Sequence, residues 1–302
     1  MSEKQHRRTV IKNMIAGSAA IAGSGTLLSS LSSCATAAKK ETVNNEKLKG
    51  KINHSVCFWT YGFLTIDELC KHVKEIGFNA IDLVGPKDWP TLQKHGIYSS
   101  MCYTGGLDSI PKGWNNPANH AQLIKDFTDV IPKMVEAGYK DVITFSGNRA
   151  GMDDETGLKN CAAGLKQVMP QAEKAGVTIH MELLNSKVDH KDYMCDLSKW
   201  GVELCKAVGS PNFKLLYDIY HMQIDEGDVI RTIRDNHQYF GHCHTGGVPG
   251  RHEIDETQEL YYPAIMKAIV DTGFKGYVAQ EFIPAKQDKI ASLRQAVHTC
   301  DV

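Results

Sequence analysis

The sequence lacks a strong excess of charge of either sign. It carries 34 Lys and Arg against 35 Asp and Glu over 302 residues, a formal net charge of −1. Proteins that bind nucleic acid through its phosphates usually carry a basic excess, so this composition disfavours a polyanionic partner. With 42% hydrophobic and 23% charged residues, the composition also excludes whole-chain disorder, a collagen-like repeat and a membrane protein of many spans.

Cysteine motifs for metal binding or thiol redox chemistry are absent as well. None of the nine cysteines forms a CxxC pair, and zinc-finger spacing of Cys and His is missing. Cys57, Cys102 and Cys243 lie within apolar, strand-like runs. We therefore expect buried free thiols; the alternative is that an oxidising compartment pairs the eight cysteines other than Cys34.

Acidic residues are missing from one long apolar segment near the start of the chain. Residues 11–31 are apolar or small, follow Arg7 and Arg8, and lead to the sequence LSSC that ends at Cys34. These flanks suit an export signal better than a membrane span. The twin arginine resembles a Tat signal, and LSSC resembles a bacterial lipobox that would make Cys34 the lipidated first residue of the mature protein.

This segment predicts a Tat-type lipoprotein signal peptide at 1–33, followed by a polar tether at 34–51 that is too poor in apolar residues to build a core. The expected location is outside the cytoplasm, periplasmic or anchored to the membrane. Membrane contact is expected only through the signal or the lipid anchor. A conventionally cleaved signal and a buried N-terminal helix are the alternatives.

After residue 51, strand-like and helix-like segments alternate eight times. Short apolar, β-branched runs are each followed by a longer segment with helical spacing. We expect strands at 54–61, 80–84, 98–103, 141–146, 178–184, 213–219, 240–244 and 277–282. We expect helices at 65–76, 88–94, 120–137, 158–175, 197–208, 229–236, 262–272 and 286–298.

Glycine ends several of these helices, because a left-handed residue costs glycine nothing. Eight βα units of roughly thirty residues predict the α/β class and a single-domain (β/α)8 TIM barrel over 52–302. A doubly wound open sheet is the alternative. That fold would place a Gly-rich nucleotide loop after its first strand, but residues 59–63 read WTYGF.

Charged residues lie at the carboxyl ends of four late strands: Glu182, Asp218, His244 and Glu281. Barrel enzymes carry their chemistry at this end of the strands. An ionised carboxylate in an apolar strand is costly unless a partner or a metal compensates it. One such residue alone could simply form an ion pair or cap a helix. Together the four form an oxygen-rich set that suits one Mn²⁺, Mg²⁺ or Co²⁺ ion, with Zn²⁺ also possible.

Other residues near the strand ends have two interpretations. His180 and His242 are expected to be hydrogen-bonded interior residues rather than ligands. Aromatic side chains near the ends of early strands either form an apolar wall for a small sugar or keto acid or fill the barrel. These aromatic residues are Trp59, Tyr61, Tyr103 and Trp114. Of the four, Trp59 and Tyr61 are the two that we predict to bind substrate.

The series Glu182, Asp218-x-x-His221, His242-x-His244 and Glu281 resembles the xylose isomerase-like TIM barrels. The sequences PGRHE at 249–253 and ELLN at 182–185 are similar, more narrowly, to the hydroxypyruvate isomerase family. The resemblance covers nearly the whole chain after about residue 52.

The resemblance implies a metal-dependent aldose–ketose isomerase that works through an enediolate. The four strand-end residues would bind one divalent metal, and Glu182 and Glu281 would also be the acid/base pair. His221 and Arg251 would hold the oxygens or the carboxylate of a small sugar or keto-acid substrate. A homo-oligomer is compatible with this assignment, and nucleic acid is not expected as a partner.

Two departures from the family pattern leave the substrate open. Some hydroxypyruvate isomerases have Gln where this chain has His244, whereas ketose epimerases of the superfamily have His. Hydroxypyruvate isomerase is also usually regarded as intracellular, which an export signal contradicts. The alternatives are therefore an exported ketose epimerase, a metal-dependent carbohydrate lyase or hydrolase, and a non-catalytic sugar-binding barrel.

Overall fold

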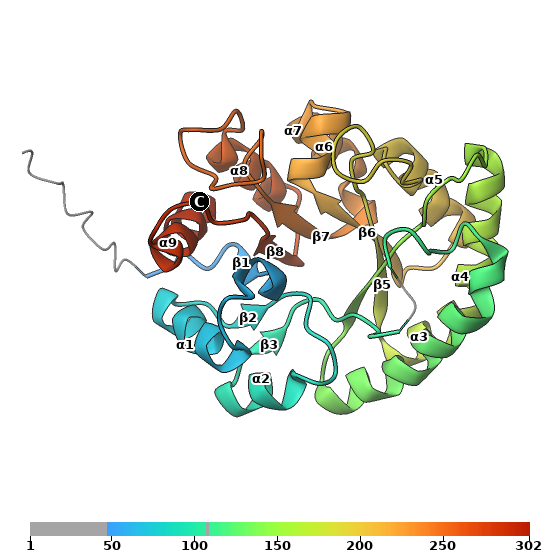
Figure 1. Cartoon of the computed structure of the whole chain (residues 1–302), viewed down its shortest axis with the longest axis horizontal. Helices are drawn as coiled ribbons and strands as arrows, with labels where there is room; N and C mark the ends of the chain where they lie inside the picture. Colours follow the sequence, from blue (N-terminus) through green and yellow to red (C-terminus); the bar gives the residue numbers. More distant parts are fainter. Residues whose placement is uncertain (1–46, 107–108) are drawn as a thin grey trace, which may run out of the picture. The chain divides into compact units, whose positions relative to one another are not determined.

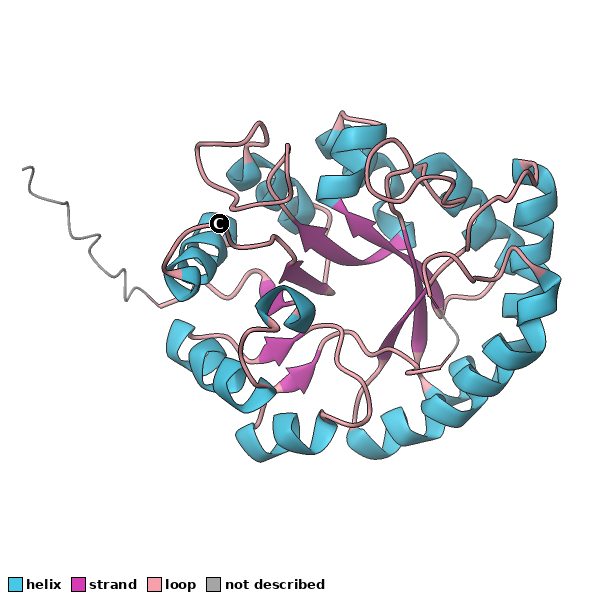
Figure 2. Ribbon diagram, in the orientation of Figure 1, coloured by secondary structure: helices cyan, strands magenta, loops and turns pink. Residues whose placement is uncertain are grey.

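Parallel strands form an inner layer of the protein and helices form an outer layer around them (Figures 1 and 2). A computed structural model describes residues 47–106 and 109–302. The predicted signal peptide, Cys34 and most of the predicted tether lie outside the described residues. In the described part of the chain, no helix combines the length and the apolar character needed to cross a membrane.

All the strands found among the described residues coincide with segments that the apolar pattern predicts. Six pair in the order β1-β8-β7-β6-β5-β4, and β2 pairs with β3. The barrel prediction is therefore confirmed. The strands are β1 (Asn53–Val56), β2 (Ala80–Ile81), β3 (Tyr98–Ser99), β4 (Asp141–Thr144), β5 (Thr178–Glu182), β6 (Phe213–Asp218), β7 (Phe240–Thr245) and β8 (Tyr277–Gln280).

Isolated β-bridges connect the two sheets into a ring. Between β1 and β2, the backbone N–H of Asp82 donates to Val56 O at 2.8 Å. Between β3 and β4, the backbone N–H of Cys102 donates to Asp141 O, also at 2.8 Å. Because these bonds continue the parallel ladders, the carboxyl ends of early and late strands meet at one mouth.

The prediction of a first strand over 54–61 is wrong beyond Val56. After Phe58 N donates to Asp82 O, the chain leaves the ladder and Phe58–Tyr61 forms a 3₁₀ helix, η1. The hydroxyl of Thr60 donates to Cys57 O at 3.0 Å and stabilises this turn. The alternation of a strand is therefore lost at Trp59 and Tyr61, which differ greatly in exposure.

The helices of the described residues cover the barrel and confirm the predicted set with one addition, α6. Gly77, Gly138 and Gly176 adopt left-handed conformations at helix ends, as expected. The helices are α1 (Ile66–Ile76), α2 (Trp89–His95), α3 (Pro117–Ala137), α4 (Asp154–Ala175), α5 (Ser198–Val208), α6 (Ile219–Asp225), α7 (Val229–Asn236), α8 (Tyr262–Asp271) and α9 (Lys289–Cys300).

Helix α6 begins without a loop, directly after the last residue of β6. Asp218 ends the strand and also caps the helix, since its Oδ1 accepts from the backbone N–H of Tyr220 at 2.8 Å and of His221 at 3.3 Å. No turn residue separates the two elements, so the sequence pattern gives no helix start here. The consequence for the site is that a backbone hydrogen bond holds His221 next to Asp218.

The described segment before β1 is tied to the end of the chain. Lys49 donates its backbone N–H to Asp301 Oδ2 at 2.8 Å, and its ammonium group donates to Asp301 O at 2.8 Å. The last residues of the predicted tether thus contact the barrel. The eight cysteines in the described residues are all free and buried, which confirms that prediction.

Candidate active site

The four polar residues predicted at strand ends converge at the barrel mouth. Glu182 and Asp218 end β5 and β6, His244 lies in β7, and Glu281 directly follows β8. These strands are neighbours in the sheet, as Figure 1 shows. One ligand atom from each residue lies within 4.8 Å of the other three, and all four residues are buried.

The imidazole of His244 is the centre of this cluster. Its Nδ1 lies 2.8 Å from Glu281 Oε2 and 3.3 Å from Glu182 Oε1. Glu182 Oε1 accepts no hydrogen bond from the described residues although it is buried. The other oxygen of Glu281 accepts a hydrogen bond from Trp59 Nε1 at 2.7 Å. Two glutamates therefore face the same imidazole nitrogen from different strands.

Asp82, just after β2, completes the support of the cluster. Its Oδ1 lies 3.1 Å from His244 Nε2 and its Oδ2 lies 2.8 Å from His242 Nε2. Ser100 donates to Asp82 Oδ2 at 2.8 Å. His242 is thus a buried interior residue beside a carboxylate, and with Asp82 and His244 it also forms a second group of possible metal ligands. The sequence interpretation missed Asp82, although a carboxylate within the apolar run 80–84 is the same signal that singled out the late strands.

The donor set fits a divalent metal. Three carboxylates and one imidazole are an oxygen-rich set typical of Mn²⁺, Mg²⁺ or Co²⁺ sites. His244 presents Nδ1 to the carboxylates while Nε2 bonds to Asp82. Histidines that bind metals commonly use their second nitrogen in this way, because the carboxylate fixes the ring orientation. Glu182, Asp218, His244 and Glu281 could therefore hold one ion.

The charges of the cluster are unevenly balanced. Burial raises the pKa of Asp218 to about 8, despite the nearby Arg251, and the neighbouring glutamates add to the rise. Burial and repulsion from Glu281 also raise the pKa of Glu182. Burial opposes ionisation of Glu281 too, but His244 and Arg251 outweigh it and hold that pKa well below its usual value. The cluster has more carboxylates than nearby cations can neutralise.

Arg251 closes the cluster from the loop after β7. Its Nη2 lies 3.2 Å from Asp218 Oδ2 and also donates to Glu281 Oε2. The guanidinium carbon lies 5.3 Å from the ring centroid of Trp59 and 5.2 Å from that of Tyr220. Arg251 Nε is buried without a hydrogen-bond partner among the described residues. A planar cation that contacts two aromatic rings is well placed to receive an oxygen ligand.

His221 lies beside Asp218 on α6. It is fully buried, and its Nε2 is 3.6 Å from Asp218 Oδ2. Within the described residues, this nitrogen has no hydrogen-bond partner. Burial lowers the pKa of His221 well below its usual value, and Arg251 lowers it further. The structure thus brings the two predicted substrate-binding residues, His221 and Arg251, to the same carboxylate.

The two aromatic residues predicted to bind substrate differ in their placement. Trp59 is 48% exposed and contacts both Glu281 and Arg251, so it belongs to the site. Tyr61 is fully buried in the core, and its hydroxyl donates to Lys289 O at 3.2 Å. The structure does not bring Tyr61 to the cluster, and its contacts match the barrel-filling interpretation.

Two of the remaining candidates from the sequence, His180 and Trp114, have hydrogen-bond partners outside the cluster of Glu182, Asp218, His244 and Glu281. His180 is buried with Nε2 2.8 Å from Asp141 Oδ1, which fits an interior role. Trp114 is fully buried and donates from Nε1 to Thr144 at 2.6 Å. Tyr103 is exposed.

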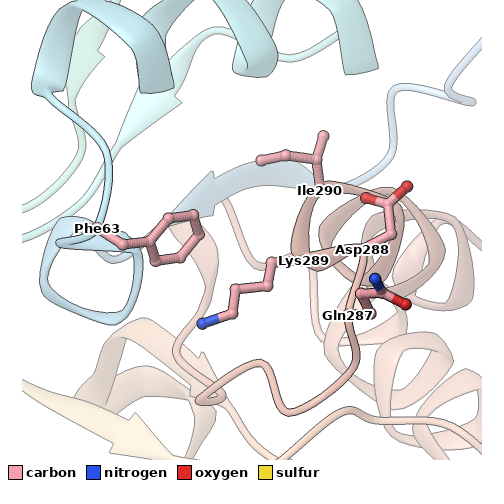
Figure 3. A pocket seen from close by; sticks show the side chains of 5 residues that line it. All are labelled: Phe63, Gln287, Asp288, Lys289 and Ile290. Atoms are coloured by element: carbon pink, nitrogen blue, oxygen red, sulfur yellow. The ribbon is translucent and has the colours of Figure 1, made fainter.

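An open pocket of about 650 Å³ lies between the segments that follow β1 and β8 (Figure 3). Phe63, which follows η1, and residues 287–290, which lie between β8 and the first turn of α9, line it. Lys289 Nζ lies 4.5 Å from the ring centroid of Phe63. None of the four cluster residues lines this pocket, so it is distinct from the candidate site.

The fold is a TIM barrel. The cluster of Glu182, Asp218, His244 and Glu281, at the carboxyl ends of its strands, could hold a metal ion. Residues 70–297 match the family model described as a xylose isomerase-like TIM barrel, and the chain belongs to this family.

Curated relatives within this similarity carry isomerase names. The chain is 36% identical over 113 residues to a 2-oxo-tetronate isomerase of Cupriavidus necator, a match that covers 37% of this chain and 43% of that protein. It is 35% identical over 231 residues to a putative hydroxypyruvate isomerase of Drosophila melanogaster, covering 73% and 86% of the two chains. The chain thus spans less than half the length of the first relative and most of the second.

Among solved structures, the 3-keto-D-glucoside 4-epimerase of E. coli superposes with a TM-score of 0.70. The superposition covers 82% of this chain and 100% of the epimerase, at 17% sequence identity. This likeness supports the barrel fold alone.

Proposed function

We propose that this protein is a metal-dependent isomerase that interconverts the keto and aldehyde forms of a small hydroxy-keto acid, with hydroxypyruvate as the leading substrate. The observation that carries the proposal is the cluster of Glu182, Asp218, His244 and Glu281, whose ligand atoms lie within 4.8 Å of one another. The names of the two curated relatives support the choice of a 2-oxo acid.

The four cluster residues would hold one divalent ion. When bound, such an ion polarises a substrate carbonyl and stabilises negative charge that develops on its oxygen. The residues of this chain would carry out the proton transfers. Glu182 and Glu281 face the same point from β5 and from the end of β8, so each carboxylate could reach one of two adjacent substrate carbons.

One glutamate removes the proton from the hydroxyl-bearing carbon beside the ketone, and the C–H electron pair becomes the double bond of an enediolate. A proton then returns to the former ketone carbon, while the hydroxyl proton moves to the former carbonyl oxygen. No atom or electron is gained or lost overall. Hydroxypyruvate would give tartronate semialdehyde in this way.

Arg251 is assigned to the substrate carboxylate, because its guanidinium can bind two oxygens at once. Replacing Arg251 with Lys keeps the positive charge but removes the planar fork. We expect kcat/KM for hydroxypyruvate to fall about 10- to 100-fold, mainly through KM. The matched control is Arg231→Lys, because Arg231 is an exposed surface residue paired with Asp228. Unchanged KM in Arg251→Lys would contradict the assignment.

Metal content and proton exchange test the proposed function. The purified protein should contain about one divalent ion per chain, and in D₂O it should exchange a carbon-bound proton of hydroxypyruvate. A chelator should abolish the exchange, and adding the ion back should restore it. A metal-free protein that exchanges no proton of hydroxypyruvate or of a ketose panel would instead favour the sugar-binding barrel.

Ketose epimerisation is the second candidate. Glu182 and Glu281 could lie on opposite faces of a substrate carbon, so that one removes its proton and the other returns a proton to the opposite face. His244 at the position where ketose epimerases of the superfamily carry His favours this chemistry. The same exchange experiment separates the candidates, because epimerisation inverts one carbon of a ketose without moving its carbonyl.

We also propose that the chain is exported and lipidated at Cys34. The support is the sequence of residues 1–34, with its twin arginine, its apolar run without acidic residues and the LSSC site. Mass spectrometry of protein from the membrane fraction should give a chain that begins at Cys34 with an attached lipid, and Cys34→Ala should lack it. A mature chain without lipid that begins at another residue would overturn the lipidation.

A further inference from the structure

His221 has two ring nitrogens with very different surroundings. Nδ1 lies 2.5 Å from the side-chain amide nitrogen of Asn185, in the loop after β5. Nε2 is buried without a hydrogen-bond partner among the described residues, on the side of Asp218. Because a neutral histidine carries one proton on one of these nitrogens, the contact at Nδ1 decides what Nε2 can do.

The side-chain amide of Asn185 can adopt only one orientation. Its Oδ1 accepts from the backbone N–H groups of Val188 at 3.0 Å and Asp189 at 2.9 Å. Its Nδ2 donates to Asp189 Oδ2 at 2.7 Å. A flipped amide would place donors against two N–H groups and an oxygen against a carboxylate. The group that faces His221 is therefore an N–H donor, so His221 Nδ1 is an acceptor without a proton.

We propose that Asn185 is a positioning residue that fixes the tautomer of His221 with its proton on Nε2. The buried Nε2–H is then a donor without a hydrogen-bonded acceptor among the described residues, with Asp218 Oδ2 3.6 Å away, and it is available for an oxygen of the substrate. An unpaired donor in such surroundings is costly, which is consistent with a ligand that completes it. The substrate part of this inference rests on the proposed function, but the tautomer does not.

Asp189 links this arrangement to Arg251. The carboxylate oxygen that accepts from Asn185 also accepts from the hydroxyl of Tyr220 at 2.8 Å. Tyr220 in turn packs against Arg251, whose guanidinium carbon lies 5.2 Å from the centroid of the Tyr220 ring. One loop carboxylate thereby supports both donors that face Asp218. Arg251 Nε and His221 Nε2 have no hydrogen-bonded acceptor among the described residues, and a carboxylate or ketone oxygen can accept from both without bringing a hydrogen of its own.

The direct test is the protonation pattern of the His221 ring. Long-range ¹H–¹⁵N correlation of ¹⁵N-histidine-labelled protein, without metal and with Mg²⁺, should show His221 with its proton on Nε2. Comparison with His221→Gln assigns the signals among the 13 histidines of the chain. A proton on Nδ1 in the wild-type protein would overturn the proposal whether or not the protein is an isomerase.

Asn185→Asp tests the cause. Aspartate keeps an oxygen for the N–H groups of Val188 and Asp189, but it presents an acceptor to His221 Nδ1. The proton should therefore move to Nδ1, and kcat/KM for hydroxypyruvate should fall roughly 10- to 100-fold. A hydroxyl-bearing ketose should lose less, because a hydroxyl can rotate to donate to Nε2.

Asn185→Asp also places two carboxylates side by side, so Asp189→Asn and the double variant Asn185→Asp/Asp189→Asn are the matched controls. Asp189→Asn alone should keep the proton on Nε2. The double variant removes the repulsion and should still carry the proton on Nδ1. A double variant with the wild-type tautomer would contradict the role of Asn185.

Discussion

Replacing Glu281 with Gln is expected to lower kcat/KM by about 10²- to 10⁴-fold while the fold is retained. Glutamine has nearly the same shape, can still accept the hydrogen bond from Trp59, and cannot remove a proton from carbon. Glu182→Gln should have a loss of the same size, because the two carboxylates serve two adjacent substrate carbons. Steady-state kinetics measures the loss of kcat/KM, and far-UV circular dichroism shows whether the fold is retained.

The two glutamates also belong to the metal-type cluster, so metal content must be measured for each variant. Glu203→Gln is the matched control, since Glu203 lies on α5 and pairs with Lys206 at the surface. That variant should keep wild-type kinetics. Near-normal turnover of either cluster variant at saturating metal would remove that residue from the proton-transfer role.

Replacing Asp82 with Asn is expected to weaken metal affinity by about 10- to 100-fold. The carboxylate lies between His242 and His244 and fixes the direction in which His244 presents Nδ1. An asparagine can keep the volume of the side chain but not its charge. Competition with a chromophoric chelator measures the affinity, and excess metal should restore much of the lost turnover.

A second histidine–carboxylate pair offers a matched control for this change. Asp67 on α1 lies 2.7 Å from His95 Nε2, and its carboxylate is partly exposed. Asp67→Asn makes the same chemical change outside the barrel mouth and should leave metal affinity unchanged. Equal metal affinity in Asp82→Asn and the wild type would show that His244 needs no support from Asp82.

The barrel could be predicted because its strands and helices differ in a property that the sequence displays directly. Short apolar, β-branched runs alternate with longer amphipathic segments, and glycine ends many of the helices. The limits of single strands were harder to place. The residues 58–61 are apolar enough for a strand, but hydrogen bonds such as that of Thr60 to Cys57 O turn them into η1. Whether residues 58–61 form a strand or a 3₁₀ helix therefore depends on where the hydrogen-bond ladder between β1 and β2 ends.

The cluster at the late strands could be predicted because charged residues stand out within apolar strands. Asp82 carries the same signal, yet its role depends on β2 lying across the ring from β7. That proximity follows from barrel closure and not from local sequence. The sequence singles out Asn185 only as part of the ELLN motif at 182–185, because its proposed effect acts through the ring of His221 on another element.

Trp59 gives the molecule an optical reporter of its own site. The other three tryptophans, Trp89, Trp114 and Trp200, are at most 8% exposed, whereas Trp59 is 48% exposed. Its indole bonds to Glu281 and lies against Arg251, so a ligand that displaces either partner alters the polarity around the most accessible tryptophan. A soluble quencher would act mainly on this side chain. Occupancy of the barrel mouth can therefore be followed by emission, without turnover and before the substrate is known.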